Sequence, residues 1–220
     1  MPVFNEGKTI HEVVAAVLRQ PCVRELVIVD DCSSDNTWSA LEKLSVDPRV
    51  KTSRHEVNQG KGAALRTAIG KTRAPLVLIQ DADLEYDPGD YARLIQPILS
   101  GEADVVFGSR FLGSEKQRSL SKLQQFGNRA LTVFSNLLTR LKLTDMETCY
   151  KVFRREIIEQ ITIEEDRFGF EPEITAKVAR LRARIREVAI SYSRRSYEEG
   201  KKIGWKDGVS ALRCILKYSL

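Results

Sequence analysis

Four carboxylates follow an apolar run in the stretch VLIQDADLEYDP, residues 77–88, and they suggest a bound cation. Asp81, Asp83, Glu85 and Asp87 occupy alternate positions after the run. Carboxylates this close repel one another unless a positive charge lies among them. Mg²⁺ and Mn²⁺ prefer oxygen ligands. The stretch is therefore interpreted as a DxD element in which one or both of Asp81 and Asp83 bind Mg²⁺ or Mn²⁺.

Three other interpretations of these carboxylates compete with a DxD element. A calcium loop of the EF-hand kind fails, because Tyr86 stands where glycine is needed and Ala92 where a bidentate glutamate is needed. A phosphatase-type aspartate nucleophile, with a second aspartate two residues on, stays open on local spacing alone. Asp87, which precedes Pro88, is predicted only to cap the next helix.

Alternating strands and helices predict the scaffold that positions these residues. Runs rich in β-formers predict strands, and amphipathic runs with caps predict helices. The expected strands are 24–30, 49–55, 74–80, 103–109, 149–155 and 185–193. The expected helices are 36–44, 60–72, 88–100, 122–143, 168–182 and 209–220, with a polar loop at 194–208. This order predicts an α/β fold with a mostly parallel sheet covered by helices.

Charged groups end three of the expected strands. Asp30 and Asp31 end one, Asp81 and Asp83 follow another, and Arg110 lies just past a third. Ligands bind beyond the carboxyl ends of the strands in open parallel sheets. We therefore expect these side chains to meet at one rim.

Composition restricts the class of protein. The 220 residues include 42% hydrophobic side chains and carry a formal charge of +5. This mild excess admits phosphorylated substrates, an anionic membrane surface or nucleic acid, but no nucleic-acid-binding signature is present. The cysteines form no metal-binding pattern with His11 and His55, so structural zinc is excluded. They are Cys22, Cys32, Cys149 and Cys214.

Targeting signals are not expected in this chain. No apolar run reaches the roughly 20 residues that span a bilayer. The start, MPVFNEGKTI, does not resemble a signal peptide. Together with the cysteine usage, this predicts a cytoplasmic protein, at the cytoplasmic face of a membrane if it acts on a lipid.

Six segments together resemble the family-2 inverting glycosyltransferases. Within that family they resemble the synthases that attach mannose or glucose to dolichyl or polyprenyl phosphate. The segments are PVFNEGKTI, VIVDDCSSDNT, NQGKGAALRTAI, LIQDADLEYDP, VVFGSRF and EVAISYSRRSYEEGKKIGWKDG. The resemblance spans essentially the whole chain and implies a single-domain GT-A fold over residues 1–220. Residues 1–115 would form the nucleotide-sugar-binding half, and residues 116–220 an acceptor-binding half that is not independent.

The resemblance implies a nucleoside site near the start of the chain. Pro2, Phe4 and Glu6 match the segment that holds the nucleoside, with Phe4 in place of the usual tyrosine. Asp31 matches the acid that contacts the base or ribose, and Val29 lies beside it. Family members usually have an apolar first strand ahead of this proline, so a central strand is either cut short or only a stub here.

The resemblance also assigns the diphosphate site. Asp81 and Ala82 match contacts to the sugar nucleotide, and Asp83 matches the metal ligand. Glu85 stands where a further metal contact is common, and Arg110 matches the arginine of a G-[ST]-R motif. Metal ligation is thus expected from Asp83, Glu85 and Asp81.

Basic residues are the candidates for binding phosphates. Arg195 and Lys201 match a family loop that closes over the phosphates, and Gly200 suits a hinge. Asp83, Arg110 and Arg195 are therefore the expected catalytic residues. Lys61 and Arg66 fit phosphate contacts and a tightly packed helix start equally well.

A phosphate acceptor would need no strong general base, because a phosphate monoester is already ionised near neutral pH. Positioning and charge stabilisation would then lower the barrier. The predicted reaction moves a hexose from a GDP-mannose or UDP-glucose type of donor to a polyprenyl or dolichyl phosphate. The alternatives are a hydroxyl acceptor such as a polysaccharide, with a base near Glu171 and Glu173, or a non-catalytic nucleotide-sugar-binding module.

A lipid acceptor implies contact with a membrane. The helices at 119–143 and 209–220 are candidates for a peripheral contact, although packing against the core explains the same pattern and is favoured over it. A membrane-protein partner is the other means of anchoring. Leu212, Ile215, Leu216 and Leu220 form the apolar side of the second helix.

Overall fold

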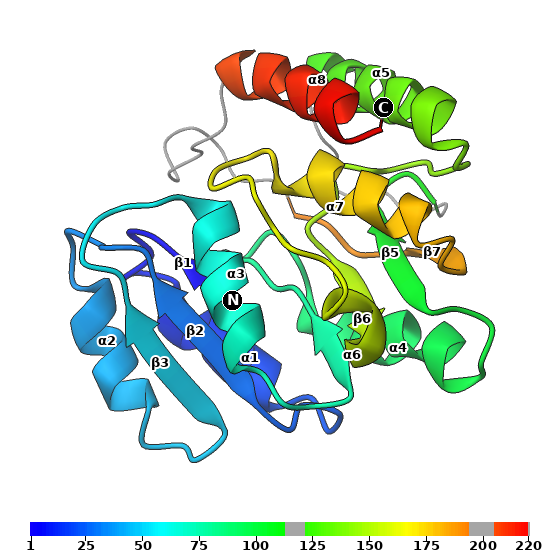
Figure 1. Ribbon diagram of the computed structural model, residues 1–220. Coiled ribbons are helices and arrows are strands. Elements are labelled where there is room, and N and C mark those ends of the chain that lie inside the picture. The colour runs from blue at the N-terminus through cyan, green and yellow to red at the C-terminus, as the bar shows by residue number, and fades with distance from the viewer. Residues whose placement is uncertain (113–121, 194–204, 220) are drawn as a thin grey trace.

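The computed structural model describes residues 1–112, 122–193 and 205–219, and it forms an α/β fold (Figure 1). The strands are β1 (Pro2–Val3), β2 (Leu26–Asp30), β3 (Val50–Arg54), β4 (Leu76–Leu78), β5 (Val105–Ser109), β6 (Lys151–Arg154) and β7 (Ile185–Ala189). The helices are α1 (Ile10–Leu18), α2 (Thr37–Leu44), α3 (Lys61–Lys71), η1 (Pro88–Asp90), α4 (Tyr91–Leu99), α5 (Lys122–Thr139), α6 (Arg155–Ile158), α7 (Phe170–Arg180) and α8 (Trp205–Ser219).

The strands form two sheets. The first has the order β1-β2-β3 and is wholly parallel. The second has the order β4-β6-β5-β7, in which β5 and β7 are parallel and β6 runs antiparallel to both β4 and β5. The expected parallel arrangement therefore has one exception, β6, which enters between two strands that precede it in the chain.

The first strand, β1, contains two residues and pairs with β2 at one end of its sheet. The first strand is therefore short, as expected, and it lies at an edge of the described three-stranded sheet. The amino group of Met1 is buried and donates a hydrogen bond to the carbonyl of Val27 at 2.9 Å. Burial lowers the pKa of this amino group to about 6.

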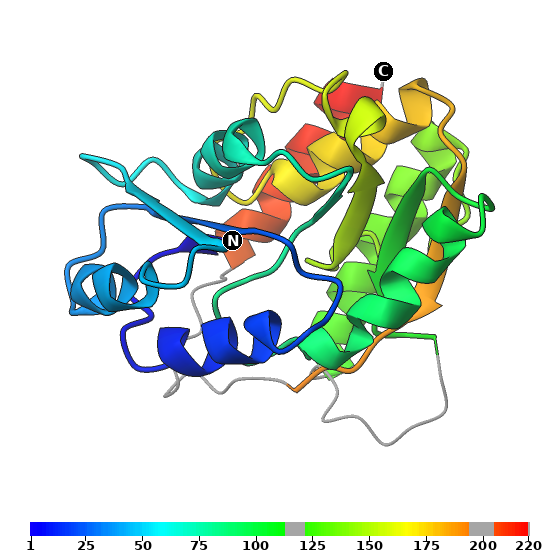
Figure 2. The ribbon, with the colours of Figure 1, turned by 90° about the horizontal axis from the view of Figure 1, so that it is seen from below.

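Helices cover both faces of the sheets. Figure 2 shows α1 and α4 on one side and α3 on the other. Helix α1 is not among the expected elements, although Ile10, Val13, Val14 and Val17 recur at helical spacing and are buried. Helix α5 ends before the expected residue 143, because Arg140 adopts a left-handed backbone with φ of 59°.

Helices α5, α7 and α8 stack on the edge of the molecule beyond the second sheet (Figure 1). Ile215 of α8 is fully buried and joins a core cluster that also contains Met1 and Phe107. One contiguous core therefore includes side chains from both ends of the chain.

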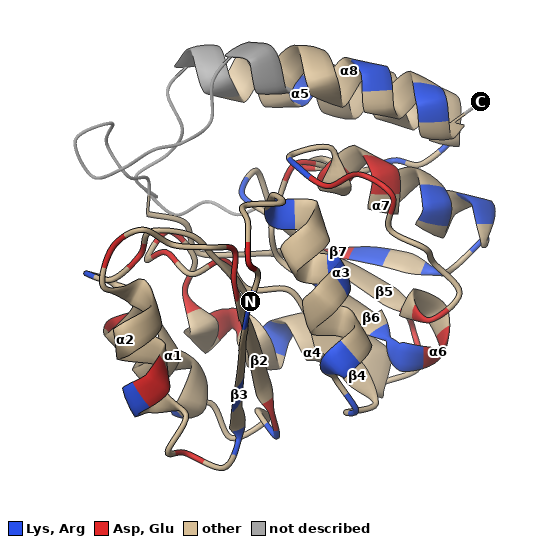
Figure 3. Ribbon diagram, turned by 60° about the vertical axis from the view of Figure 1, so that its left-hand side comes forward, with Lys and Arg blue, Asp and Glu red and all other residues tan. Residues whose placement is uncertain are grey.

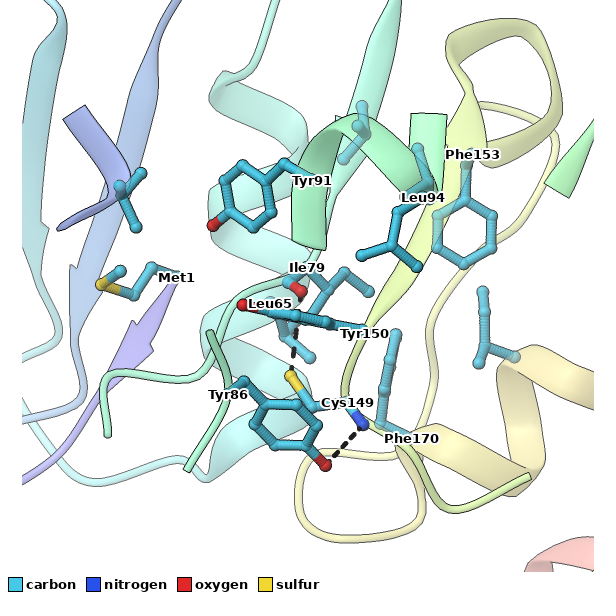
Figure 4. Close-up of a cluster of buried hydrophobic side chains, with 14 of the residues drawn as sticks. Met1, Leu65, Ile79, Tyr86, Tyr91, Leu94, Cys149, Tyr150, Phe153 and Phe170 are labelled. Carbon is cyan, nitrogen blue, oxygen red and sulfur yellow. Dashed lines mark hydrogen bonds between the residues drawn. The ribbon is translucent and has the colours of Figure 1, made fainter. Parts of the chain in front are cut away.

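Buried tyrosines fix the end of β4, where the carboxylate stretch begins. The side-chain oxygen of Gln80 accepts hydrogen bonds from the hydroxyls of Tyr91 at 2.6 Å and Tyr150 at 2.8 Å. Tyr86 packs against the Tyr150 ring with centroids 4.8 Å apart (Figure 4). Because buried phenols need hydrogen-bond partners, this network holds the backbone immediately before Asp81.

Two glycines of α3 provide a matched test of its packing. A Cβ at Gly62 would lie 1.9 Å from the backbone oxygen of Glu165, whereas a Cβ at Gly70 meets nothing within 4 Å. We expect Gly62→Ala to lower the free energy of unfolding by about 2–3 kcal/mol through overpacking. We expect Gly70→Ala to raise it by about 0.5 kcal/mol, because alanine is the better helix former. Urea denaturation of both variants checks this, and equal changes would contradict the close approach.

Candidate functional site

The loops that follow β1, β2, β4 and β7 meet at one rim of the molecule. The backbone N–H of Asp31, after β2, donates to the carbonyl of Val3 at 2.8 Å. Thr9 Oγ1, after β1, lies 3.5 Å from the carbonyl of Ala82, after β4. The backbone N–H of Ser193, after β7, donates to the carbonyl of Glu85 at 2.8 Å. These contacts bring together the ends of β1, β2, β4 and β7.

The segment after β1 is locked to the loop after β2. The backbone N–H of Asn5 donates to Ser33 Oγ at 2.9 Å, and that of Glu6 donates to Thr37 Oγ1 at 2.9 Å. Asn5 adopts φ of 53°, a left-handed conformation that asparagine tolerates better than most residues. Phe4, between β1 and Asn5, is half-buried. The two segments therefore form one unit at the predicted nucleoside site.

Asp31 is held within the protein by both of its carboxylate oxygens. Oδ1 lies 2.7 Å from His55 Nδ1 and accepts from the backbone N–H of Gln59 at 2.9 Å, while Oδ2 accepts from that of Gly60 at 2.7 Å. The side chain is almost fully buried. In this arrangement Asp31 fixes the loop that leads into α3.

Three other predicted substrate-binding residues lie near the strand ends, and their side chains are buried or half-buried. Val29 is fully buried and clusters with Ala64 and Ala68 of α3. Ala82 is 4% exposed, and Pro2 pairs with Val29 across the first sheet. Their side chains contribute packing, and their position at the strand ends is set by the sheet.

A lysine bridges two carboxylates beside the start of α3. Lys61 Nζ lies 3.0 Å from Asp81 Oδ1 and 2.8 Å from Glu171 Oε1 on α7. All three side chains are less than a fifth exposed. Burial lowers the pKa of Lys61, but the two acids raise it well above its ordinary value, so the ammonium stays charged. The sequence left two interpretations of the GKGAA segment open, a charge for the site and a tightly packed helix start. Lys61 places a positive charge beside Asp81, and Gly62 packs closely against the backbone of Glu165.

Asp83 and Glu85 lie at the end of β4, beside β7. The backbone N–H of Glu85 donates to Asp83 Oδ1 at 3.1 Å. The hydroxyl of Tyr192 donates to Glu85 Oε2 at 2.8 Å, and burial raises the pKa of this phenol, so it stays protonated. Asp87 caps η1 by accepting from the backbone N–H of Gly89 at 2.8 Å, as predicted.

The residues fit a divalent ion that has only a few protein ligands. Within residues 1–112, 122–193 and 205–219, no three Asp, Glu, His or Cys side chains form a group that could hold a metal. Mg²⁺ is usually bound by one or two carboxylates together with substrate phosphates. Asp83 and Glu85 are the candidates for that pair, and the Asp81 carboxylate forms an ion pair with Lys61.

Arg110 forms a bidentate ion pair with a buried aspartate. Its Nε lies 2.7 Å from Asp145 Oδ2, and its Nη2 lies 2.8 Å from Oδ1. Asp145 is fully buried, and Arg110 is 8% exposed at its side chain. The guanidinium also lies over the Tyr192 ring, 5.2 Å from its centroid. The pair fixes the plane of the guanidinium at the rim.

Glu147 is an acidic residue of this region that is not among the predicted site residues. It lies on the turn 144–149 that joins α5 to β6. Burial is the largest cause that raises its pKa to about 7, and the nearby Glu171 raises it further. Lys151 and Arg110 oppose this shift. The carboxyl is therefore close to half protonated at neutral pH.

Charges of both signs line the rim. In Figure 3 acidic segments appear on the loops at the strand ends, and α5 carries basic but no acidic residues. Arg195 and Lys201, predicted to close over phosphates, lie outside the described residues. Their roles stay predictions.

The comparison with protein families decides what this arrangement belongs to. The model of "Glycosyl transferase family 2" matches residues 1–162. The chain belongs to glycosyltransferase family 2. It is therefore an enzyme, a glycosyltransferase, as the resemblance of its six segments implied.

Curated relatives of this glycosyltransferase include enzymes named for lipid phosphates. The undecaprenyl-phosphate mannosyltransferase of Micrococcus luteus is 28% identical over 212 residues, which cover 93% of this chain and 86% of that protein. The polyprenol monophosphomannose synthase of Mycolicibacterium smegmatis is 26% identical, with 93% and 80% covered. The UDP-N-acetylglucosamine–dolichyl-phosphate N-acetylglucosaminyltransferase of Methanococcus voltae is 28% identical, with 74% and 70% covered.

Solved structures confirm the predicted GT-A fold. Glucosyl-3-phosphoglycerate synthase from Mycobacterium tuberculosis in complex with UDP superposes with a TM-score of 0.76 at 19% identity. The match covers 99% of this chain and 78% of that one. The same protein with Mn²⁺ and UDP-glucose gives a TM-score of 0.75 at 20% identity.

Three functional candidates of this glycosyltransferase come from the structure alone. They are Asp145, Glu147 and, in its contact with Lys61, Glu171, which the sequence had suggested only as the neighbourhood of a base for a hydroxyl acceptor. Asp145 and Glu171 meet their partners across 35 and 110 residues of sequence, a separation that no local pattern reports. The sequence contained one local signal for Asp145 and Glu147. These two acids stand close together in TDMETCYK, directly before an expected strand.

The raised pKa of Glu147 predicts a pH-dependent stability. A carboxyl whose folded pKa lies above its unfolded value loses its stabilising contribution as pH rises, here between its ordinary value of 4.5 and about 7. At pH 8 the buried carboxylate should cost about 2–3 kcal/mol. We expect Glu147→Gln to be more stable than the wild type by about this amount at pH 8 and equal to it at pH 5. Urea denaturation at both pH values measures the difference, and a variant that is less stable at pH 8 would contradict the prediction.

Proposed function

We propose that this chain transfers a hexose from a nucleoside-diphosphate sugar to a polyprenyl phosphate. The observation that carries this proposal is the similarity along 93% of the chain to an undecaprenyl-phosphate mannosyltransferase. Relatives from bacteria and archaea whose names include a polyprenyl or dolichyl acceptor support the same class of acceptor.

The donor would occupy the rim above β1, β2 and β4. Phe4 and Glu6 would contact the nucleoside, and Asp31 would maintain the loop that encloses it. Asp81 would hold the sugar nucleotide together with Lys61, whose ammonium already lies 3.0 Å from its carboxylate. Residues 1–115 would thus form the donor half and residues 116–220 the acceptor half of one domain.

Asp83 and Glu85 would hold the divalent ion, Mg²⁺ or Mn²⁺. When bound, the ion supplies positive charge that stabilises the leaving diphosphate. The hydrogen bond from Tyr192 orients Glu85, and that from the Glu85 backbone orients Asp83. This chain therefore positions both carboxylates before any substrate binds.

In the transfer step a phosphate oxygen of the acceptor attacks the anomeric carbon of the sugar. The bond between that carbon and the diphosphate oxygen breaks, and the nucleoside diphosphate leaves with the electron pair, on the opposite face of the sugar. No proton needs to be removed, because the acceptor is ionised. Arg110, Arg195 and Lys201 would stabilise the phosphate charges, and arginine suits phosphate through its paired donors.

The structure provides one observation against a hydroxyl acceptor that uses Glu173 as its base. Glu173 is fully buried and accepts hydrogen bonds from the backbone N–H groups of Glu164 at 2.7 Å and Glu165 at 2.8 Å. It also pairs with Lys177 at 2.6 Å. Its carboxylate therefore orders a loop.

A lipid acceptor requires contact with a membrane, and we propose that α5 supplies it. Phe126, Val133 and Leu137 are 73%, 58% and 72% exposed. They line an open hollow of about 490 Å³ together with Arg129, Ala130 and Phe134. Residues 122–142 contain no acidic side chain, which suits an anionic surface. None of the helices in the described part of the chain combines the length and hydrophobicity of a membrane crossing.

The sequence of helix α8 left two alternatives open, packing against the core and contact with a membrane, and the helix has a side that suits each. Ile215 is fully buried in the core, whereas Leu212 and Leu216 are 43% and 44% exposed. One side of the helix therefore packs, and another remains available beside α5. Leu220 lies outside the described residues.

The membrane proposal predicts a loss of vesicle binding. Phe126→Ser with Leu137→Ser should reduce co-sedimentation with vesicles of phosphatidylglycerol by about tenfold or more, because two large apolar side chains no longer enter the interface. The matched control is Val46→Ser, a change at an apolar residue that is 84% exposed after α2. Equal binding of all three proteins would contradict a contact through α5.

Calorimetry with nucleotides tests the donor site. GDP and UDP are titrated with and without Mn²⁺ into the wild type and Asp83→Ala. Binding of one nucleotide that needs both the metal and Asp83 supports the site and identifies the donor base. Binding of neither nucleotide to folded protein would overturn the proposal.

A further inference from the structure

The turn 144–149 is fixed on both sides of Glu147. The backbone N–H of Met146 donates to Thr132 Oγ1 on α5 at 3.1 Å. The backbone N–H of Cys149 donates to the Tyr86 hydroxyl at 3.1 Å (Figure 4). The turn is therefore a rigid part of the rim.

A buried lysine completes this support. Lys151 on β6 is fully buried, and its ammonium donates to the carbonyl of Met146 at 3.1 Å and to that of Thr148. These carbonyls flank Glu147. The ammonium also lies 4.8 Å from the centre of the Phe107 ring. The backbone at Glu147 is thus held without any use of its side chain.

The side chain of Glu147 has an oxygen without a partner. Oε1 is buried and has no hydrogen-bond partner among the described residues, and the same holds for Thr148 Oγ1 on the next residue. Buried polar atoms are almost always satisfied, because an unmet hydrogen bond costs free energy. Two adjacent unsatisfied atoms on a rigid turn at the rim indicate a ligand that completes them.

The charges that face Glu147 define the chemistry of that ligand. They are Glu171 on α7, Lys151 on β6, Arg110 after β5 and Asp145 on the same turn. Arg110 keeps donors beyond the two that bind Asp145, since a guanidinium carries five. An anion attracted by Arg110 would come close to Glu147. An ionised Glu147 would repel it, whereas the carboxylic acid would donate a hydrogen bond to it.

We propose that Glu147 binds the acceptor phosphate as a protonated carboxyl, donating a hydrogen bond to a phosphate oxygen beside Arg110. This inference rests on the proposed function and adds a residue that positions the acceptor. The proton stays on Glu147 throughout, because the phosphate needs no base. Burial raises the pKa of Glu147 to about 7, so the carboxyl is mostly protonated below neutral pH, which supports this role.

The consequence is a dependence of acceptor use on pH. Above pH 7 a phosphate monoester is fully ionised, so a change there does not come from the acceptor. As Glu147 loses its proton, kcat/KM for the acceptor should fall by about tenfold for each pH unit. Glutamine, which always donates, should remove this fall.

The test measures kcat/KM for undecaprenyl phosphate from pH 6 to 9 at saturating donor, for the wild type, Glu147→Gln and Glu147→Ala. The control is Glu159→Gln, a change at an exposed acid that directly follows α6. We expect Glu147→Gln at pH 8.5 to keep its pH 6 value within about threefold, while the wild type and Glu159→Gln lose about tenfold or more. Glu147→Ala should show a raised KM for the acceptor at every pH.

Two results would overturn the inference. One is a wild-type profile that stays flat above pH 7, which needs no variant. The other is a Glu147→Gln enzyme that binds nucleotide in calorimetry but transfers no sugar, because a base would then be required. A wild type that binds nucleotide but never glycosylates the lipid would overturn the proposed function, and this inference with it. A wild type that glycosylates the lipid with a flat pH profile would overturn this inference alone.

Discussion

Replacing Asp83 by asparagine is expected to lower kcat for sugar transfer by about 10²–10³-fold, with the fold intact. The change removes the charge of a carboxylate that we propose to hold the divalent ion at the leaving diphosphate. Loss of one group that stabilises developing charge usually has an effect of this size, about 3–4 kcal/mol of barrier. Steady-state rates with saturating donor and acceptor measure it, and circular dichroism verifies the fold.

The matched control for this change is Asp87→Asn. Asp87 lies on the same loop, is exposed, and caps η1 through an oxygen that asparagine retains. We expect its kcat to stay within about twofold of the wild type. A loss of similar size in both variants would show that the loop, rather than the charge of Asp83, determines the rate.

Breaking the Arg110–Asp145 pair is expected to destabilise the protein by about 3–5 kcal/mol. Asp145→Asn leaves the guanidinium with a neutral partner in a site where both side chains are almost inaccessible. Removal of one member of a buried ion pair has a cost of this order, because the remaining charge is not compensated. Urea denaturation at pH 7.5 gives the difference in free energy of unfolding.

A second bidentate pair separates the effect of burial from that of geometry. Arg184 contacts Asp104 with Nε at 3.0 Å and Nη2 at 2.7 Å, but its side chain is 58% exposed. The guanidinium holds the pKa of Asp104 down at about 2. We expect Asp104→Asn to cost about 1 kcal/mol or less. A cost equal to that of Asp145→Asn would contradict the argument from burial.

Local sequence patterns predicted the strand ends and the charged residues placed on them. Asp81 and Asp83 follow β4, and Arg110 follows β5, because apolar runs and acidic or basic endings are visible within ten residues. The cap at Asp87 is likewise local. The order of such segments predicted the α/β fold, and the resemblance to the family implied its GT-A form.

Contacts between distant segments were not predictable in this way. Lys61 meets Glu171 across 110 residues, and β6 enters antiparallel between β4 and β5. Neither depends on periodicity or on turn chemistry. The Asp31 carboxylate, expected at the base or ribose, is bound on both oxygens by residues 55–60. Nothing in the sequence around Asp31 indicates these contacts.

The central claim is transfer of a hexose to a lipid phosphate, and one assay tests it most directly. GDP-mannose and UDP-glucose, each labelled in the sugar, are incubated with the enzyme and Mn²⁺ in the presence of undecaprenyl phosphate, undecaprenol or 3-phosphoglycerate. We predict label in the undecaprenyl phosphate product from one donor and none on the other two acceptors. Label on 3-phosphoglycerate or undecaprenol, or on no acceptor by an enzyme that binds the nucleotide, would contradict the account.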